Sequence, residues 1–255
     1  MAIAKLPKHY DNYVFDLYGT LMDIHTDESN PIIWEKLAFF YGYYDARYTG
    51  DEIKAAYESL IHGKEKEMQG DMLKAGKDNP RYAHEAFPEL EITDVFQKLF
   101  EEKGVMADRT LAIHAGQFFR VMTMDYVRYY PGTTEMLQQL KKQGKGIYLL
   151  SNAQHIFTEY ELHALDMAQY FDGIMISSDY GTKKPDPRFF DMMMEKYDLQ
   201  KEGTLFVGND SKTDIAGAQS VGLDTFYVNS NISPEGDSAD TATYQVAAFD
   251  EWGLN

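Results

Sequence analysis

The chain has 255 residues, 44% of them hydrophobic, and its formal net charge at pH 7 is −17. This length and composition allow a sizeable core, whereas the excess negative charge disfavours binding to nucleic-acid backbones and anionic membranes. The chain has no cysteine for disulfides, thiolate metal sites or nucleophilic catalysis. It also lacks any run of about 18 apolar residues that could span a membrane, and residues 1–8 do not resemble a secretory signal. We therefore expect a cytoplasmic protein without nucleic-acid or membrane partners.

Residues 14–21 predict a short apolar strand that ends in Asp16 and is followed by a turn containing Gly19. Ligands of open α/β sheets bind at the carboxyl ends of strands. A carboxylate in that position can act as a nucleophile and form a covalent intermediate. The alternative is that Asp16 is a turn or helix-capping residue, and this segment alone leaves both interpretations open.

The second half of the chain alternates between two kinds of pattern. Apolar runs predict strands at 146–150, 173–177, 204–208 and 225–229, and helical patterns lie between them at 153–166, 187–197 and 212–221. Such alternation predicts an α/β fold, a Rossmann-like parallel sheet with helices on its faces. The span 229–242 is rich in Asn, Ser, Asp and Thr and predicts a surface loop.

Residues 24–128 have a different pattern. Helical periodicity extends over 31–44, 50–74, 91–103 and 108–127, without a comparable apolar strand run. We therefore predict a core domain from residues 1–23 and 129–255, interrupted by a helical domain at 24–128.

Polar residues follow two further predicted strands, and a lysine-containing loop lies between them. Ser151 and Asn152 end the strand at 146–150, and Asn209, Asp210 and Asp214 follow the strand at 204–208. The loop at 181–187 holds two adjacent lysines and two prolines.

In this chain order, the strand ending in Asp, the strand ending in Ser-Asn, the lysine loop and the acidic cluster resemble the four motifs of the haloacid dehalogenase superfamily of hydrolases. The resemblance covers most of residues 12–23 and 129–230. It implies that the insertion at 24–128 is a helical cap over the active site.

The resemblance implies a role for each motif. Asp16 is the expected nucleophile, and Lys184, which precedes Pro185, is expected to stabilise its charge and that of the transferred group. Thr20 and Ser151 would donate hydroxyl hydrogen bonds to the bound anion, and Asn152 would add a backbone N–H. Thr20, Ser151 and Asn152 are alternatively turn or cap residues.

The acidic cluster predicts a magnesium site. Its expected ligands are Asp16, the backbone carbonyl of Tyr18, and Asn209 or Asp210, with Asp214 close by, because a hard cation prefers oxygen ligands. Asn209 aligns with the usual ligand, whereas Asp210 has the better charge. Asp210 is alternatively an N-terminal helix cap.

Tyr18 divides the candidate functions. Phosphatases of the superfamily usually carry a second Asp at this position, as general acid and base, whereas its haloacid dehalogenases carry Tyr. Because the last motif is acidic, the favoured function is a magnesium-dependent phosphatase acting on a small phosphorylated metabolite through an aspartyl-phosphate. The alternatives are a metal-independent 2-haloacid dehalogenase with Asp16 as nucleophile, and a non-catalytic binding protein on this fold. The sequence leaves the oligomeric state open.

Overall fold

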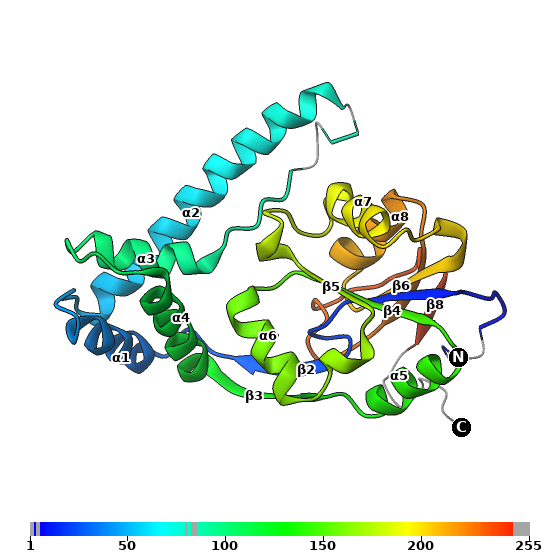
Figure 1. Ribbon diagram of the computed structural model, residues 1–255, viewed down its shortest axis with the longest axis horizontal. Coiled ribbons are helices and arrows are strands. Elements are labelled where there is room, and N and C mark those ends of the chain that lie inside the picture. Colours follow the sequence, from blue (N-terminus) through cyan, green and yellow to red (C-terminus); the bar gives the residue numbers. More distant parts are fainter. Residues whose placement is uncertain (1–2, 4–5, 80, 83–85, 247–255) are drawn as a thin grey trace.

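The main sheet has six parallel strands in the order β5-β4-β1-β6-β7-β8 (Figure 1). A computed structural model describes residues 3, 6–79, 81, 82 and 86–246. The strands of this sheet are β1 (Asn12–Phe15), β4 (Gly146–Ser151), β5 (Gly173–Ile176), β6 (Thr204–Gly208), β7 (Asp224–Val228) and β8 (Tyr244–Val246). The predicted Rossmann-like parallel sheet is therefore confirmed, with β8 as an additional edge strand.

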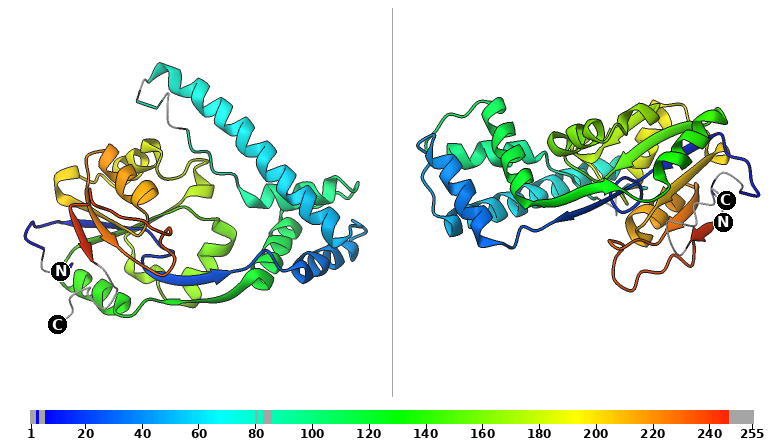
Figure 2. Two further views of the ribbon diagram at one scale, coloured as in Figure 1. Left: turned by 180° about the vertical axis from the view of Figure 1, so that it is seen from behind. Right: turned by 90° about the horizontal axis from the view of Figure 1, so that it is seen from below.

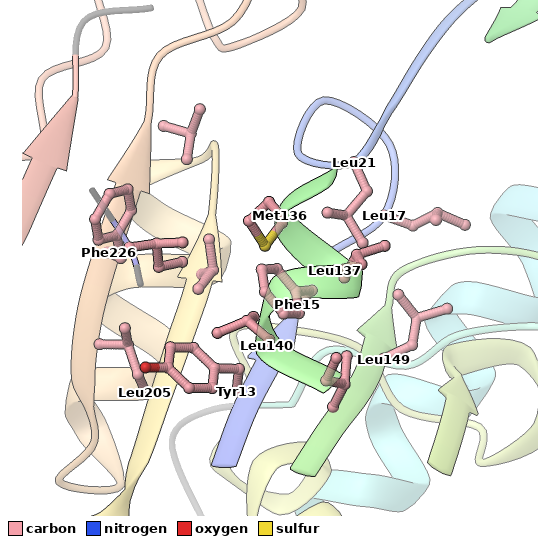
Figure 3. Close-up of a cluster of buried hydrophobic side chains, with 14 of the residues drawn as sticks. Tyr13, Phe15, Leu17, Leu21, Met136, Leu137, Leu140, Leu149, Leu205 and Phe226 are labelled. Carbon is pink, nitrogen blue, oxygen red and sulfur yellow. The ribbon is translucent and has the colours of Figure 1, made fainter. Parts of the chain in front are cut away.

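Two hydrophobic clusters bury the two faces of this sheet. Phe15 belongs to the cluster that includes α5 (Thr133–Lys142) and α6 (His155–Ala164), part of which is drawn in Figure 3. Val14 belongs to the opposite cluster, with α7 (Pro187–Lys196) and α8 (Gly217–Ser220). Because neighbouring residues of β1 are buried on opposite faces, its apolar run is continuous, as is typical of parallel sheets.

The register of β1 brings the ends of three strands together. Phe15 lies opposite Leu149 of β4 and Val207 of β6. Parallel strands present their carboxyl ends at one edge, so the residues that follow β1, β4 and β6 meet there.

Four further helices form a region with its own hydrophobic cluster, which includes Trp34, Phe96 and Phe119. They are α1 (Pro31–Gly42), α2 (Gly50–Ala75), α3 (Ile92–Glu101) and α4 (Arg109–Thr123). Figures 1 and 2 show the main sheet at one end of the molecule and α1, α3 and α4 at the other, with α2 extending from that end toward the middle. The described residues between 31 and 123 are called the helical region below. Thr49 begins the longest helix, α2, with a capping box that it forms with Glu52. We propose that the helical region is the cap domain.

A two-stranded antiparallel ribbon joins the helical region to the main sheet. Its strands are β2 (Met22–Thr26) and β3 (Met124–Tyr129), with Met22 opposite Tyr129. The prediction that 24–128 contains no strand and that a helix extends to residue 127 was wrong. Residues 124–129 follow α4 without Gly or Pro, and they become a strand because they pair with residues about 100 positions earlier.

The remaining predicted elements lie close to their expected positions. The predicted helix at 212–221 begins as a π-helical turn (Ser211–Ala216) and continues as α8. Short 3₁₀ turns lie at Gly76–Asp78, Ala168–Tyr170, Ser177–Asp179 and Lys201–Gly203. Within the described part of the chain, no helix combines the length and hydrophobicity that a membrane span requires.

Core packing in the helical region gives a stability prediction. Phe96 of α3 is fully buried, whereas Phe39 on α1 is 72% exposed. We expect Phe96→Ala to lower the free energy of unfolding by about 3–5 kcal/mol, since it removes apolar contacts and leaves a cavity. Phe39→Ala is the matched control and should change it by about 0.5 kcal/mol or less. Denaturant unfolding measures both, and equal losses would contradict the assigned core.

Candidate functional site

Asp16 is buried directly after β1, where its backbone N–H donates to Val207 of β6 at 2.9 Å. Its Oδ1 accepts a hydrogen bond from Lys184 Nζ at 2.6 Å, and its Oδ2 accepts one from Thr20 Oγ1 at 3.2 Å. The turn that follows depends on Gly19, which has a φ of 91°. A Cβ at this position would lie 2.3 Å from the Asn209 side chain, so another residue there would force the site apart.

Lys184 lies between two carboxylates and is itself buried. Its Nζ is 2.6 Å from Asp16 and 2.7 Å from Asp214. Burial opposes its positive charge, but the two carboxylates outweigh this effect and raise the pKa of Lys184. Asn152 fixes the lysine backbone through two hydrogen bonds, which its side chain makes with the Lys184 N–H and carbonyl at 2.8 and 2.9 Å.

The backbone that follows β6 donates hydrogen bonds to the carboxyl group of Asp214. Its Oδ2 accepts backbone N–H bonds from Asn209 and Asp210 at 3.0 and 3.1 Å. Burial raises the pKa of Asp214 to about 7, the charge of Asp16 acts in the same direction, and Lys184 opposes both. Gly208 leaves the space for this carboxyl, since a Cβ there would lie 2.4 Å from it.

Asn209 and Asp210 make different contacts. Asn209 is buried, and its Oδ1 accepts a hydrogen bond from Thr20 Oγ1 at 3.3 Å. Asp210 caps the following helical turn, because its Oδ1 accepts backbone N–H bonds from Lys212 and Thr213 at 2.7 and 2.8 Å. The described residues contain no group of three or more His, Cys, Asp or Glu side chains arranged to hold a metal ion.

Ser151 and Thr20 differ in how their hydroxyl groups are used. Thr20 Oγ1 lies within hydrogen-bond distance of both Asp16 and Asn209, so its proton is directed within the protein. The Oγ of Ser151 is buried at the end of β4 and has no hydrogen-bond partner in the described structure. A buried polar group without a partner is unfavourable, which marks this hydroxyl as a candidate ligand-binding group.

The Tyr18 hydroxyl is directed to α6. It donates to Glu161 Oε2 at 2.5 Å and lies 3.1 Å from Thr158 Oγ1. Arg120 of α4 donates to both oxygens of Glu161, at 2.8 and 3.2 Å. Burial and the Glu161 charge raise the pKa of Tyr18 far above its usual value. Glu161 and Arg120 were not predicted from the sequence, since neither belongs to a motif and only tertiary packing brings them to Tyr18.

A pocket of about 320 Å³ brings seven of the nine predicted site residues together, whereas Thr20 and Ser151 are buried and are not among the residues that line it. It is lined by Asp16, Tyr18, Asn152, Lys184, Asn209, Asp210, Thr213, Asp214, Ile232 and Pro234. Ile232 and Pro234 come from the span 229–242, so this span is more than the surface connection that we predicted. The available signal was its position, because it follows β7 at the same carboxyl edge of the sheet. No described residue of the helical region is among those that line the pocket.

Lys183 lies outside this pocket, although it is adjacent to Lys184. Its Nζ is 3.7 Å from Glu65 of α2 and 3.9 Å from Glu89. Lys183 therefore contacts the helical region, which distinguishes the two neighbouring lysines.

The chain is similar to phosphatases over part of its length. It is 29% identical over 143 residues to the phosphoserine phosphatase of Thermus thermophilus, an alignment that covers 55% of each chain. The chain spans about half the length of the first curated phosphatases that it matches. A longer alignment, 25% identical over 247 residues, covers 96% of this chain and 94% of the Bacillus subtilis protein YfnB.

Solved structures share the whole fold. The YfnB structure bound to magnesium has a TM-score of 0.52 at 22% identity and covers 96% of this chain and 97% of that one. The 2-haloacid dehalogenase of Pseudomonas syringae has a TM-score of 0.52 at 19% identity and covers 93% and 94%. At these identities the likeness shows the fold alone.

The family is shown by a match along most of the chain. A family model for haloacid dehalogenase-like hydrolases matches residues 10–222, which include the four motifs and the helical region. The chain belongs to the haloacid dehalogenase-like hydrolase family.

Proposed function

We propose that this protein is a magnesium-dependent phosphatase that acts on a small phosphorylated metabolite. The observation that carries the proposal is the charge of the pocket, which is lined by the carboxyl groups of Asp16, Asp210 and Asp214 and by a single cation, the buried Lys184. A phosphate dianion would add further negative charge. Phosphate chemistry in this pocket therefore requires a divalent cation, whereas halide displacement from carbon does not.

In the proposed reaction, an oxygen of Asp16 attacks phosphorus and forms an aspartyl-phosphate, while the bond to the leaving oxygen breaks. Water then attacks phosphorus, which releases inorganic phosphate and regenerates the carboxylate. Lys184 keeps Asp16 oriented through its 2.6 Å contact and offsets the negative charge of the transferred group.

Ser151 and Asn152 are the proposed phosphate-binding residues. The unpartnered Ser151 hydroxyl would gain a hydrogen bond to a phosphate oxygen. The Asn152 side chain already holds the Lys184 backbone, so its contribution to phosphate is the backbone N–H. Thr20 contributes less directly to phosphate binding, because its hydroxyl already lies within hydrogen-bond distance of Asp16 and Asn209.

The donor set suits magnesium, which binds proteins through one or two carboxylates and retains several waters. Asp16, the Tyr18 carbonyl and Asp210 or Asn209 would hold the ion. Asp214 would stay nearby, since its oxygens accept bonds from Lys184 and two backbone N–H groups. Bound magnesium would neutralise negative charge and polarise the phosphoryl group.

One residue favours the alternative of a 2-haloacid dehalogenase. Tyr18 matches the dehalogenase pattern, and that reaction would use Asp16 to displace halide without a metal. The substrate in either case is a small anion, in keeping with the pocket volume of about 320 Å³. We also propose that the protein is cytoplasmic.

The nucleophile is tested by Asp16→Asn. We expect turnover to fall by several powers of ten, because the amide cannot form the aspartyl-phosphate. The fold should survive, since the change removes one of two carboxylates that share Lys184. Asp125→Asn, at an exposed carboxylate paired with His25, is the control and should retain activity. Near-normal turnover of the Asp16 variant of a correctly folded protein would refute the assignment.

The cofactor is tested with two substrates. Hydrolysis of p-nitrophenyl phosphate should stop with excess chelator and return with added magnesium, whereas 2-chloropropionate should release no chloride. Chloride release that is insensitive to chelator, without phosphatase activity, would instead establish the dehalogenase function.

The role of Ser151 predicts opposite effects on activity and stability. We expect Ser151→Ala to weaken phosphate-ester turnover, yet to leave the ligand-free protein equally stable or more stable, because it removes an unpartnered buried hydroxyl. Ser177→Ala is the matched control. That buried hydroxyl bonds Glu89 and the Ala153 backbone, so its loss should cost about 1–3 kcal/mol. Denaturant unfolding without phosphate compares them, and a destabilised Ser151 variant would contradict the proposal.

A further inference from the structure

We infer that the substrates of this site are phosphates with weakly basic leaving groups, namely acyl, enol or aryl phosphates or phosphoanhydrides, rather than phosphates of alkyl alcohols. This inference rests on the proposed phosphatase function and narrows its substrate class. It follows from the hydrogen bonds of Tyr18 and Lys184, whose protons are donated to carboxyl groups of the protein.

The leaving oxygen decides whether an acid is required. When the P–O bond breaks, this oxygen keeps the electron pair. An alkoxide is strongly basic and must be protonated as it leaves, and a positioned general acid typically contributes about 10²–10⁴ in rate to such a step. A carboxylate, enolate, phenolate or phosphate leaves as a stable anion and takes its proton later from solvent.

Tyr18 follows the nucleophile by two positions and lines the pocket, but its proton is directed elsewhere. The hydroxyl donates to Glu161 at 2.5 Å, and Arg120 holds that carboxylate through two hydrogen bonds. The side chains of Glu161 and Arg120 are only 6% and 18% exposed. To protonate a leaving group, Tyr18 would have to break its hydrogen bond to Glu161. This would leave a buried carboxyl oxygen without that donor, which is unfavourable.

The other ionisable side chains of the pocket are also engaged. Lys184 donates to both Asp16 and Asp214, so the loss of a proton would remove the positive charge that these two carboxyl groups share. Asp214 accepts bonds through both oxygens, and Asp210 accepts two backbone N–H bonds through Oδ1. Among the described residues that line the pocket, the phenol of Tyr18 and the ammonium group of Lys184 both donate to carboxyl groups of the protein.

The inferred reaction therefore proceeds without a general acid from the protein. Asp16 forms a bond to phosphorus, the leaving group departs as an anion, and solvent protonates that anion outside the bond-breaking step. The pocket wall made by Ile232 and Pro234 is apolar, so it offers the leaving oxygen no acidic group either.

Acetyl phosphate and ethyl phosphate test the inference, because they are similar in size and differ mainly in the basicity of the leaving group. The measured quantity is kcat/KM for phosphate release by the magnesium-loaded protein, since it reports the steps up to departure of the leaving group. Each rate is corrected for hydrolysis without protein. We expect ethyl phosphate to be slower by roughly 10² or more. Comparable values would overturn the inference but leave the phosphatase function intact. No phosphate release from any ester, p-nitrophenyl phosphate included, would instead refute the phosphatase function.

Variants at position 18 test whether the site lacks a general acid at this position. Tyr18→Phe should change both substrates to a similar degree and leave the ethyl-to-acetyl ratio unchanged. A selective loss on ethyl phosphate would identify Tyr18 as the acid and overturn the inference. Tyr18→Asp restores an acidic group, and Tyr18→Asn is its matched control without the proton. We expect the ratio to rise at least about tenfold in the Asp variant relative to the Asn variant. Equal ratios in these two variants, both checked by circular dichroism, would contradict position 18 as the place of the missing acid.

Discussion

The contact between one buried lysine and two buried carboxylates organises this protein. Lys184 meets Asp16 and Asp214 at 2.6 and 2.7 Å, and these residues come from a loop, the end of β1 and the chain after β6. Removing one partner of a buried ion pair typically costs about 3–5 kcal/mol, because the remaining charge is left uncompensated. Here two carboxylates share one lysine. Loss of one carboxylate therefore relieves the repulsion between the two, whereas loss of the lysine leaves both carboxylates without their cation. Lys184, which is proposed to act in catalysis, therefore also contributes to the stability of this edge of the sheet.

The helical region contacts this arrangement without lining the pocket. Backbone hydrogen bonds join residues 87–89 to the loop that carries Lys184, from Lys183 N to Phe87 O at 3.0 Å and from Glu89 N to Gly181 O at 3.1 Å. On the other side, Arg120 of α4 reaches Tyr18 through Glu161. If the proposed function holds, substrate selection would depend on the leaving group and on Ile232 and Pro234 of the loop after β7, which line the pocket.

Tyr18 shows why residue identity at one motif position does not decide the reaction. A tyrosine two positions after the nucleophile is compatible with dehalogenase chemistry, with packing and with phosphoryl transfer. Its neighbours show what the side chain does here, because the Tyr18 hydroxyl donates to Glu161 and Arg120 donates to both oxygens of the same carboxyl group. The acidic residues after β6 are the independent observation that favours phosphate chemistry.

The sequence by itself determined the parallel sheet and the position of Asp16, Ser151 and Asn209 along one edge of it, because apolar runs specify buried strands and parallel strands share one carboxyl edge. It also separated a helical insertion from the sheet. Only the tertiary structure decided the β2–β3 pairing, the partners of Tyr18 and the entry of Ile232 into the pocket. These features join residues far apart in the chain, and no local periodicity or motif spacing encodes such contacts, so they form only when the packed elements bring the residues together.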